Sequence, residues 1–471
     1  MLKQRPIDYG LLLLSLILYY FLGFVVKRYE TFLLFFAYFG VFFIYAYIVL
    51  HASNDNLKFW CYTSILFRIL LLFAVPNLSD DFYRFIWDGR LLASGYHPFA
   101  EVPAFYIQHD IQIPGINGEL FIKLNSPDYF TIYPPLAQFI FWLSVKLSSN
   151  SIYGSLIVMK CVIVGAEIGS VLVIRRLLAT FNFTQTRILL YALNPLVILE
   201  LSGNIHLEAV VIFLLLLSLY LLQGQKNLFS AIFFSLAICI KLVPLIFLAA
   251  LFPRLGWKKA LQFYFIVLAT GAIVFLPLWD KEIIFGFQNS ISYYFKKFEF
   301  NASLYYLIRG LGYWLFGFNI IQIAGWVLGV MAFIVIMIIS MVSPWSIVHT
   351  CYAFRVGPWL APKGNRPSST NHRLSTIDHG LFLTFTLILL TFFLFTTTLH
   401  PWYITTLLAL SIFTEFRFTL LWTGLIFLTY GGYSMHGFQE NLWITLIEYI
   451  SVLGYLAYEL LWQRKFLSQV S

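Results

Sequence analysis

Long apolar runs recur along the whole chain, and they limit the fold more than any other sequence feature. The first three cover residues 9–26, 31–50 and 59–76, and similar runs continue to residues 442–462. With 60% hydrophobic and 11% charged residues, the composition excludes a soluble domain. An α-helix crosses a bilayer with roughly 20 apolar residues, so the runs predict about 11 to 13 transmembrane helices. We expect an all-α polytopic membrane protein, with residues 1–471 forming a single integral membrane domain.

Charged residues are few and scattered, which narrows the class of partner. The chain has 30 Lys and Arg against 21 Asp and Glu, an excess that suits anionic lipid headgroups. Because the basic residues form no patch in the sequence, we expect a lipid bilayer as partner and no nucleic acid. The sequence also lacks a Gly-rich phosphate loop and a Gly-x-Gly-x-x-Gly pattern, which argues against a nucleotide-binding domain.

One polar stretch, residues 79–103, follows directly after an apolar run. A protein this apolar rarely places so much charge against a membrane boundary without a function. We therefore interpret the loop that this stretch opens, residues 78–132, as an extracytoplasmic catalytic loop. Its seven acidic residues are Asp80, Asp81, Asp88, Glu101, Asp110, Glu119 and Asp128.

The start of this stretch has the pattern of a capped helix. Ser79 is a good N-cap, and Asp80 and Asp81 would then lie in the first turn, where negative charge suits the helix dipole. Arg84 is four residues from both Asp80 and Asp88, so these charges share one helix face. A structural alternative stays open, namely an amphipathic helix on the membrane with paired charges, because ion pairs also gather at such sites.

The order of the apolar runs predicts which loops share a side of the membrane. With a cytoplasmic N-terminus, three crossings place residues 78–132 outside. Residues 344–379 carry four basic residues against one acid, so the positive-inside rule makes them a cytoplasmic loop. The run 381–399 then crosses outward and brings residues 400–403, His-Pro-Trp-Tyr, to the side of the catalytic loop.

Between residues 175 and 259 the charges and the number of apolar runs predict different sides of the membrane. Basic residues near both ends of the segment favour the cytoplasmic side, but three apolar runs separate them. We expect one of these runs to be short, broken or re-entrant. The polar interruption at residues 203–208, Gly-Asn-Ile-His-Leu-Glu, indicates a broken helix or a buried polar site.

Polar side chains inside apolar runs are further candidates. Lys160 and Glu167 lie seven residues apart on one helix face, and interhelical ion pairing explains them without a function. Lys241 needs an anionic partner from the protein or from a ligand. His206 alone favours a buried structural histidine, whereas its neighbour Glu208 favours a functional site.

Residues 79–90, Ser-Asp-Asp-Phe-Tyr-Arg-Phe-Ile-Trp-Asp-Gly-Arg, resemble a family motif. The motif is Asp-Asp-x-Tyr-Arg-Tyr-x-Trp-Asp-Gly-Arg of the bacterial polyprenol-phosphate-mannose-dependent mannosyltransferases in the GT-C superfamily. Further segments are similar to this family in the same order: residues 95–99, 132–138, 191–197 and 206–209, Lys241 with Pro244, and residues 300–304 and 400–403. Two positions depart from the family pattern, His97 in place of Asn and Glu208 in place of Asp.

The resemblance implies a GT-C-like fold with a large first extracytoplasmic loop, placed in the bacterial inner (plasma) membrane with the active site outside. It implies a polyprenyl-phosphate-sugar donor, with mannose as the sugar, and a glycan or lipid acceptor. No cofactor is required, although a divalent metal is not excluded.

The same resemblance gives roles to residues. A hydroxyl acceptor needs a general base, for which we favour Asp80, with Asp81 orienting or gripping the sugar. Cationic donors would take the departing phosphate, from Lys241, Arg84, Arg90 and His400. Trp87, Trp402 and Tyr403 would form a lipid groove or stack on the sugar, although the last two are equally explained as interfacial anchors. The remaining substrate-binding candidates are Tyr83, Asp88, His206, Glu208 and Asn301.

Two other functions fit the same composition. A transporter or flippase for a lipid-linked saccharide would also need buried charge and a polar cavity, but the sequence has no internal repeat and concentrates its acids in one loop. A polysaccharide polymerase or ligase that uses a whole glycan as donor is the second alternative.

Overall fold

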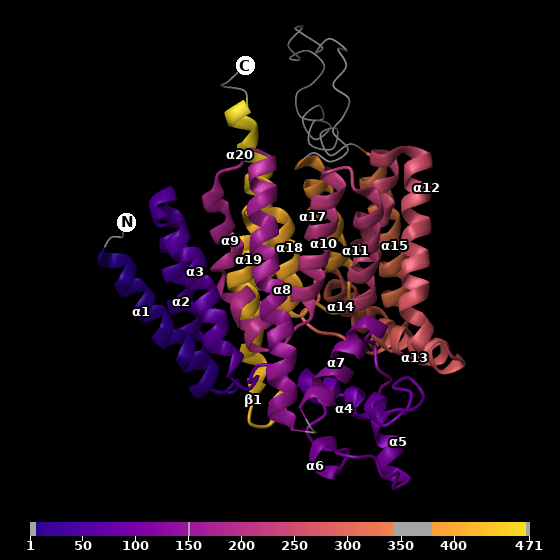
Figure 1. Ribbon diagram of the computed structural model, residues 1–471. Helices are drawn as coiled ribbons and strands as arrows, with labels where there is room; N and C mark the ends of the chain where they lie inside the picture. The colour runs from indigo at the N-terminus through magenta and orange to yellow at the C-terminus, as the bar shows by residue number, and fades with distance from the viewer. Residues whose placement is uncertain (1–5, 149–150, 343–378, 468–471) are drawn as a thin grey trace.

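The structure is a computed structural model that describes residues 6–148, 151–342 and 379–467. Most of this part of the chain is helical, and its strands are one short antiparallel pair, β1 (Tyr433–Ser434) and β2 (Gly437–Phe438). The helices form a bundle in which most axes run along one common direction (Figure 1). The expected all-α polytopic membrane fold is confirmed. The predicted cytoplasmic loop, residues 344–379, lies outside the described residues except for the backbone of its last residue.

Fewer of the described helices have the length and composition of a complete crossing than the sequence suggests. Those long and apolar enough to cross a membrane are six: Pro6–Val25, Thr31–His51, Ile152–Thr180, Val243–Leu278, Ile321–Met341 and Leu442–Leu461. Other apolar helices are shorter, namely Pro135–Leu147, Asn227–Ile240, Gly380–Phe395 and Phe418–Gly432. The expectation of about 11 to 13 spans counted such runs as complete crossings, because an apolar run does not show where its helix breaks.

The N-terminal helices lie on one side of the bundle. They are α1 (Pro6–Tyr20) with the π-helical continuation η1 (Phe21–Val25), α2 (Thr31–His51) and α3 (Asn54–Leu72). α3 begins with a capping box, in which the side chains of Ser53 and Asn56 each accept a hydrogen bond from the other residue's backbone.

Buried polar side chains join α3 to α8 (Ile152–Thr180). Arg68 in α3 pairs with Glu167 in α8 at 2.7 Å between Nη2 and Oε2, so the interhelical ion pair expected for Glu167 is confirmed. Lys160 has another role: its ammonium donates to the backbone carbonyls of Leu71 and Ala74 at 2.7 and 2.6 Å. These carbonyls lie at the C-terminal end of α3, where backbone acceptors outnumber helical donors, so the lysine caps that helix.

The segment expected as a catalytic loop forms a small helical cap at one end of the bundle. It contains α4 (Asp81–Ala93), α5 (Pro103–Gln108) and α6 (Gly118–Phe121), followed by α7 (Pro135–Leu147). The C-terminal end of α20 (Leu442–Leu467) lies at the opposite end (Figure 1). Gly89 lets α4 approach α7 closely, since a Cβ at this position would lie 2.5 Å from the carbonyl oxygen of Phe141.

The middle of the chain contains the expected break. After η2 (Gln185–Ile188) and α9 (Leu189–Ala192), the π-helical segment η3 (Val197–Gly203) is followed by α10 (Glu208–Gln223) at a bend of 110°. The prediction that one run here is broken or re-entrant is confirmed. α11 (Asn227–Ile240) ends at Lys241, and η4 (Val243–Phe247) leads into α12 (Leu248–Phe275), which kinks at Gly256 (φ 73°).

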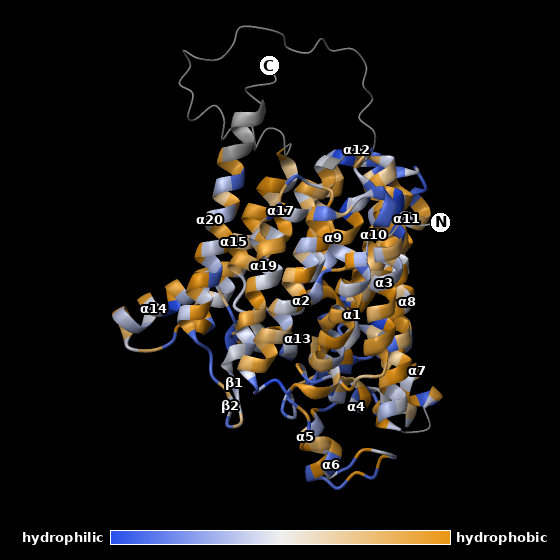
Figure 2. Ribbon diagram, turned by 90° about the vertical axis from the view of Figure 1, so that its left-hand side faces the viewer, coloured by the Kyte–Doolittle hydropathy of each residue, from blue (hydrophilic) through white to orange (hydrophobic). Residues whose placement is uncertain are grey.

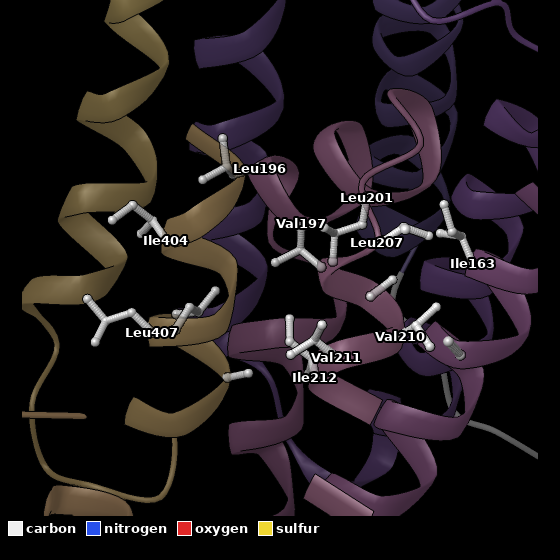
Figure 3. Packing of buried hydrophobic residues seen from close by; sticks show 14 of the residues in the cluster. Ile163, Leu196, Val197, Leu201, Leu207, Val210, Val211, Ile212, Ile404 and Leu407 are labelled. Carbon is white, nitrogen blue, oxygen red and sulfur yellow. The ribbon is translucent and has the colours of Figure 1, made fainter. Parts of the chain in front are cut away.

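Apolar packing holds this broken region in place. Side chains on both sides of the break, including Val197, Leu201 and Val210, belong to one buried apolar cluster with Ile163 of α8 and Ile404 of α18 (Ile404–Ser411) (Figure 3). Burying each such side chain contributes roughly 1.5–3 kcal/mol, and this contribution stabilises a bend that carries polar side chains into the protein.

The remaining helices complete the bundle. They are η5 (Leu276–Leu278), α13 (Lys281–Lys296), α14 (Leu304–Phe316), α15 (Ile321–Met341), α17 (His379–Phe395), η6 (Pro401–Tyr403), α18 (Ile404–Ser411), α19 (Phe418–Leu425) and η7 (Ile426–Gly432). Apolar residues dominate along the bundle, and hydrophilic residues gather in the loops at its two ends (Figure 2).

Candidate active site

A cavity of about 420 Å³ lies where the helical cap meets the bundle. Its walls come from α4, the loop of residues 125–133, the junction after α11, the second half of α13, and residues 400–403. Of the residues predicted for the site, the following line it: Asp81, Arg84, Lys241, His400, Trp402 and Tyr403. The fold therefore brings together candidates that lie more than three hundred residues apart in the sequence.

The two adjacent aspartates have different surroundings. Asp81 lines the cavity, and its Oδ1 accepts a hydrogen bond of 2.7 Å from Nδ2 of Asn125. Burial raises the pKa of Asp81 above its ordinary value, and the Asn125 hydrogen bond opposes this shift. Asp80 precedes the first turn of α4 and pairs with Arg28 at 2.6 Å. Asp80 is not among the lining residues of this cavity, so the geometry favours Asp81 over Asp80 as the residue that meets a substrate.

Arg84 is fixed in the cavity wall by several partners. Its Nε donates to Oδ1 of Asp88 at 2.8 Å, and Nη1 donates to the backbone carbonyls of Ser126 and Tyr129 at 3.1 and 2.8 Å. Asp88 is fully buried and also accepts a bond of 3.0 Å from Gln138. The predicted Arg84–Asp88 pairing on one helix face therefore holds the loop of residues 125–133 against α4.

Lys241 has its anionic partner within the protein. Its ammonium lies 2.5 Å from Oε1 of Glu208 and 5.5 Å from the ring centroid of Tyr403. Glu208 begins α10 after the bend, so the broken helix supplies the carboxylate that neutralises this lysine.

A stack of aromatic rings borders the cavity, and two of its members, His400 and Trp402, line it. The indole of Trp402 lies parallel to the imidazoles of His206 and His400, with ring centroids 3.7 and 4.4 Å apart and interplanar angles of 15° and 5°. Trp402 is only 8% exposed, which leaves little of its face for a sugar. Burial, and to a smaller extent the Lys241 ammonium, lowers the pKa of His400 to about 3, so this imidazole is neutral at physiological pH.

Glu200, which was not among the predicted site residues, lies beside His206 of this stack. Its Oε1 accepts a hydrogen bond of 2.7 Å from the Tyr430 hydroxyl, and its Oε2 lies 3.4 Å from Nε2 of His206. Glu200 is fully buried in η3. The signal that would have identified it is an acidic residue within the apolar run 188–202.

Some predicted site residues pack within the helical cap and are not among the cavity's lining residues. Trp87 is buried with its ring centroid 6.5 Å from that of Tyr106. Nη1 of Arg90 donates to the carbonyl of Gly115. Tyr83 lies under the Lys123 ammonium at 5.6 Å. These residues stabilise the cap, which itself positions Asp81.

Asn301 also lies away from the cavity and fixes the backbone beside it. Its Nδ2 donates to both carboxylate oxygens of Glu448 at 3.2 Å, and its own backbone has a left-handed φ of 44°. The preceding residue, Phe300, exchanges backbone hydrogen bonds with Thr397 and Leu399 at 3.1 and 2.8 Å. Asn301 thus helps to hold the segment that leads directly into His400.

Several other lining residues were not predicted as site residues: Asn125, Asp128, Tyr129, Tyr293, Lys296 and Lys297. They come from the end of the cap loop and from α13, and no local pattern in the sequence distinguishes them from other interfacial polar residues. Within the described ranges, no group of three or more His, Cys, Asp or Glu side chains is arranged to hold a metal ion.

Comparison with known proteins identifies the family. The sequence model described as "Alpha-(1->6)-mannopyranosyltransferase, N-terminal domain" matches residues 20–255, half of the chain. The chain belongs to this family. The resemblance that the sequence motifs indicated is therefore confirmed. Asp81, Glu208 and Lys241 lie inside the matched range, whereas α13 and residues 400–403 lie beyond it.

A curated relative gives the same family name. The chain is 24% identical to alpha-(1->6)-mannopyranosyltransferase A of Mycobacterium tuberculosis (strain ATCC 25618 / H37Rv) over 179 residues, which is 38% of this chain. The match spans 33%, about a third, of the length of that relative.

Proposed function

We propose that this protein is a membrane glycosyltransferase that moves mannose from a polyprenyl-phosphate donor to a hydroxyl of a glycan or lipid acceptor. The family and relative are named for α-(1→6)-mannopyranosyl transfer, and we extend that activity to this chain. The protein would act in the bacterial inner membrane, with its active site on the extracytoplasmic side.

The observation that carries the proposal is the position of the Asp81 carboxylate. It lines the cavity of about 420 Å³ described above, which we call the polar cavity because charged and amide side chains line it, and a second, apolar cavity adjoins it. The second cavity, of about 370 Å³, lies between α15, α17 and η4 and shares Tyr403 with the polar cavity. Its lining is mostly apolar and includes Ile246, Phe333 and Phe392. A sugar phosphate on an isoprenoid chain has the same division, since its head is polar and its tail is apolar.

The chemistry is a single displacement at the anomeric carbon. The acceptor oxygen forms a bond to C1 of the mannose while the bond between C1 and the phosphate oxygen breaks. Asp81 takes the proton of the acceptor hydroxyl, and the bonding electron pair leaves with the polyprenyl phosphate. A single displacement inverts the anomeric carbon, so an α-linked product requires a β-linked donor. The donor already carries its leaving group, so no nucleotide and no cofactor is needed.

The proposed sidedness rests on the arrangement of the two ends of the bundle. The helical cap lies at one end of the bundle, while the C-terminal end of α20 lies at the other (Figure 1). Asp81 and Arg84 of the cap line the polar cavity. Residues 463–465, Gln-Arg-Lys, fall near that end of α20, and basic residues flanking a span favour the cytoplasmic side. The cavity would then open outside the cytoplasm.

Reconstitution in proteoliposomes tests the proposal. The full chain is given polyprenyl-phosphate-[14C]mannose and an α-mannoside acceptor, and the product is digested with a linkage-specific mannosidase. We expect labelled α-(1→6)-mannoside with this donor and none with GDP-mannose. Label that crosses the bilayer without forming a glycoside would instead support a flippase and refute the proposal.

A further inference from the structure

The cations inside the cavity are already neutralised by the protein. Arg84 pairs with the buried Asp88, and Lys241 pairs with Glu208. A cation that is held by a buried carboxylate has little net charge left for a departing phosphate, and breaking such a pair leaves a buried charge without a partner at a large cost. Arg90, the other guanidinium predicted for the phosphate, is not a lining residue.

Two further cations line the cavity at the end of α13. Lys296 is the last residue of this helix and Lys297 its C-cap, and both side chains are exposed. Among the described residues, neither ammonium has an ion-pair partner, and Lys297 lies 5.9 Å from the ring centroid of Tyr293. These lysines therefore supply positive charge to the cavity that no described carboxylate pairs with directly.

Their position relative to the apolar cavity suits a lipid-linked phosphate. Phe298, the next residue, lines the polar cavity, and its carbonyl accepts a hydrogen bond of 3.2 Å from the hydroxyl of Thr398, a residue that lines the apolar cavity. α13 also packs against α15, which forms one wall of the apolar cavity. The lysines thus lie near the boundary where the head and tail of the donor would meet.

An in-line displacement needs the base and the phosphate-binding group on different sides of the sugar. Asp81 belongs to the first turn of α4, whereas Lys296 and Lys297 lie at the end of α13, so different walls of the cavity carry them. In a single displacement the leaving group departs on the opposite side of the anomeric carbon. A phosphate-binding cation is therefore needed away from Asp81.

We propose that Lys296 and Lys297 bind the phosphate of the isoprenoid donor and stabilise it as it leaves. This inference rests on the proposed function. The chemistry that the two ammonium groups recognise is a phosphate at the membrane interface, which either an isoprenoid phosphate or a phospholipid headgroup supplies, and we commit to the isoprenoid phosphate.

The same helix offers a matched control. Lysine in the last turn of a helix also favours the helix dipole, and interfacial lysines contact headgroups without any substrate. Lys281, at the other end of α13, is exposed and is not a lining residue. Replacing it removes one interfacial charge and leaves the cavity unchanged.

The experiment measures how well lipids displace labelled donor from the purified full-length protein in neutral-lipid nanodiscs. The competitors are a polyprenyl phosphate, the polyprenol without phosphate, and phosphatidylglycerol. The proteins are the wild type, Lys296→Gln/Lys297→Gln and Lys281→Gln, each checked for an unchanged thermal midpoint. For the double variant, we expect the preference for polyprenyl phosphate over polyprenol to fall about tenfold, the size expected for two partly exposed ion pairs. We expect Lys281→Gln to keep the preference.

Each contrary result has a distinct meaning. If the double variant keeps the wild-type preference for polyprenyl phosphate over polyprenol, the assignment of these lysines is overturned and the proposed function stays intact. If phosphatidylglycerol competes as well as polyprenyl phosphate with the wild type but not with the double variant, the lysines bind phospholipid headgroups. This result also overturns their assignment to the isoprenoid phosphate. A wild type without any preference for the phosphorylated isoprenoid refutes the proposed function together with this inference.

Discussion

Asn125 donates a hydrogen bond of 2.7 Å to Asp81, and this bond joins the first turn of α4 to a loop 44 residues further along the chain. Both residues line the polar cavity. The bond favours the ionised carboxylate, while burial, the larger effect, favours the neutral acid and raises the pKa of Asp81. Asn125 therefore adjusts the protonation of the proposed base.

This relationship predicts the pH dependence of transfer. A raised pKa keeps Asp81 protonated to higher pH than an ordinary aspartate, so kcat/KM should rise with pH as the base form accumulates. Asn125→Ala removes the bond that opposes the shift, and the acidic limb of the kcat/KM profile should move to higher pH. Asn289→Ala is the control, because Asn289 lines the same cavity but donates to the carbonyl of Phe285. An acidic limb that stays in place in Asn125→Ala would contradict the prediction.

The ring stack predicts a positioning role for His206. His206→Ala removes one of the two imidazoles that hold Trp402, and aromatic contacts of this kind are worth about 0.5–1.5 kcal/mol. We expect kcat/KM to fall by up to about tenfold, the equivalent of that energy. His206→Phe keeps a stacked ring and should restore most of the activity. Equal activity in the two variants would show that the stack does not position Trp402.

The fold class was predictable because hydrophobicity along a helix is a local property. Runs such as residues 31–50 and 321–341 are helices of bilayer length in the structure. Helix breaks depend on tertiary contacts and were harder to place. The bend before α10 was indicated by the polar residues 203–208, whereas the kink of α12 at Gly256 had no recognised signal.

The apolar cavity predicts a defect in donor binding. Ala332 of α15 is buried and lines this cavity, so Ala332→Phe should exclude part of an isoprenoid chain. At about 0.8 kcal/mol per buried CH₂, losing the contact of one isoprene unit should raise the donor KM at least about tenfold. Val330→Phe, at a 57% exposed position of the same helix that does not line the cavity, is the matched control.

A donor analogue separates this effect from misfolding. The KM of a water-soluble mannosyl phosphate with a short alkyl chain should not change in Ala332→Phe. A similar rise in KM for the long and short donors would show that the substitution damages the polar cavity instead.

The candidate site was predictable where a local motif carried it. Lys241 was expected to need an anion, and the structure gives it Glu208, another predicted residue. The motif could not decide between Asp80, which we favoured from the sequence, and Asp81, which lines the cavity. The surroundings of the two carboxylates differ through tertiary contacts, such as the ion pair between Asp80 and Arg28. Lys296 and Asn125 enter the cavity through tertiary packing alone.

The buried pair between α3 and α8 predicts a large effect on stability. Arg68 and Glu167 are 1% and 0% exposed, so Glu167→Gln leaves a buried guanidinium without its counter-charge and should destabilise the protein by about 3–5 kcal/mol. Glu415→Gln breaks the exposed pair with Arg187, in which Glu415 is 61% exposed, and should cost at most about 1 kcal/mol. Thermal unfolding in detergent compares them, and similar midpoints would contradict the prediction.

The central claim is that the Asp81 carboxylate accepts the proton of the acceptor hydroxyl. Its most direct test is single-turnover mannosyl transfer by Asp81→Asn, with Asp80→Asn as the adjacent control and donor binding measured in both. We expect Asp81→Asn to bind donor normally and to lose roughly 10²–10⁴-fold in rate, the usual contribution of a general base, while Asp80→Asn stays within about tenfold of the wild type. Near-normal transfer by Asp81→Asn, or an equal loss in Asp80→Asn, would contradict the account.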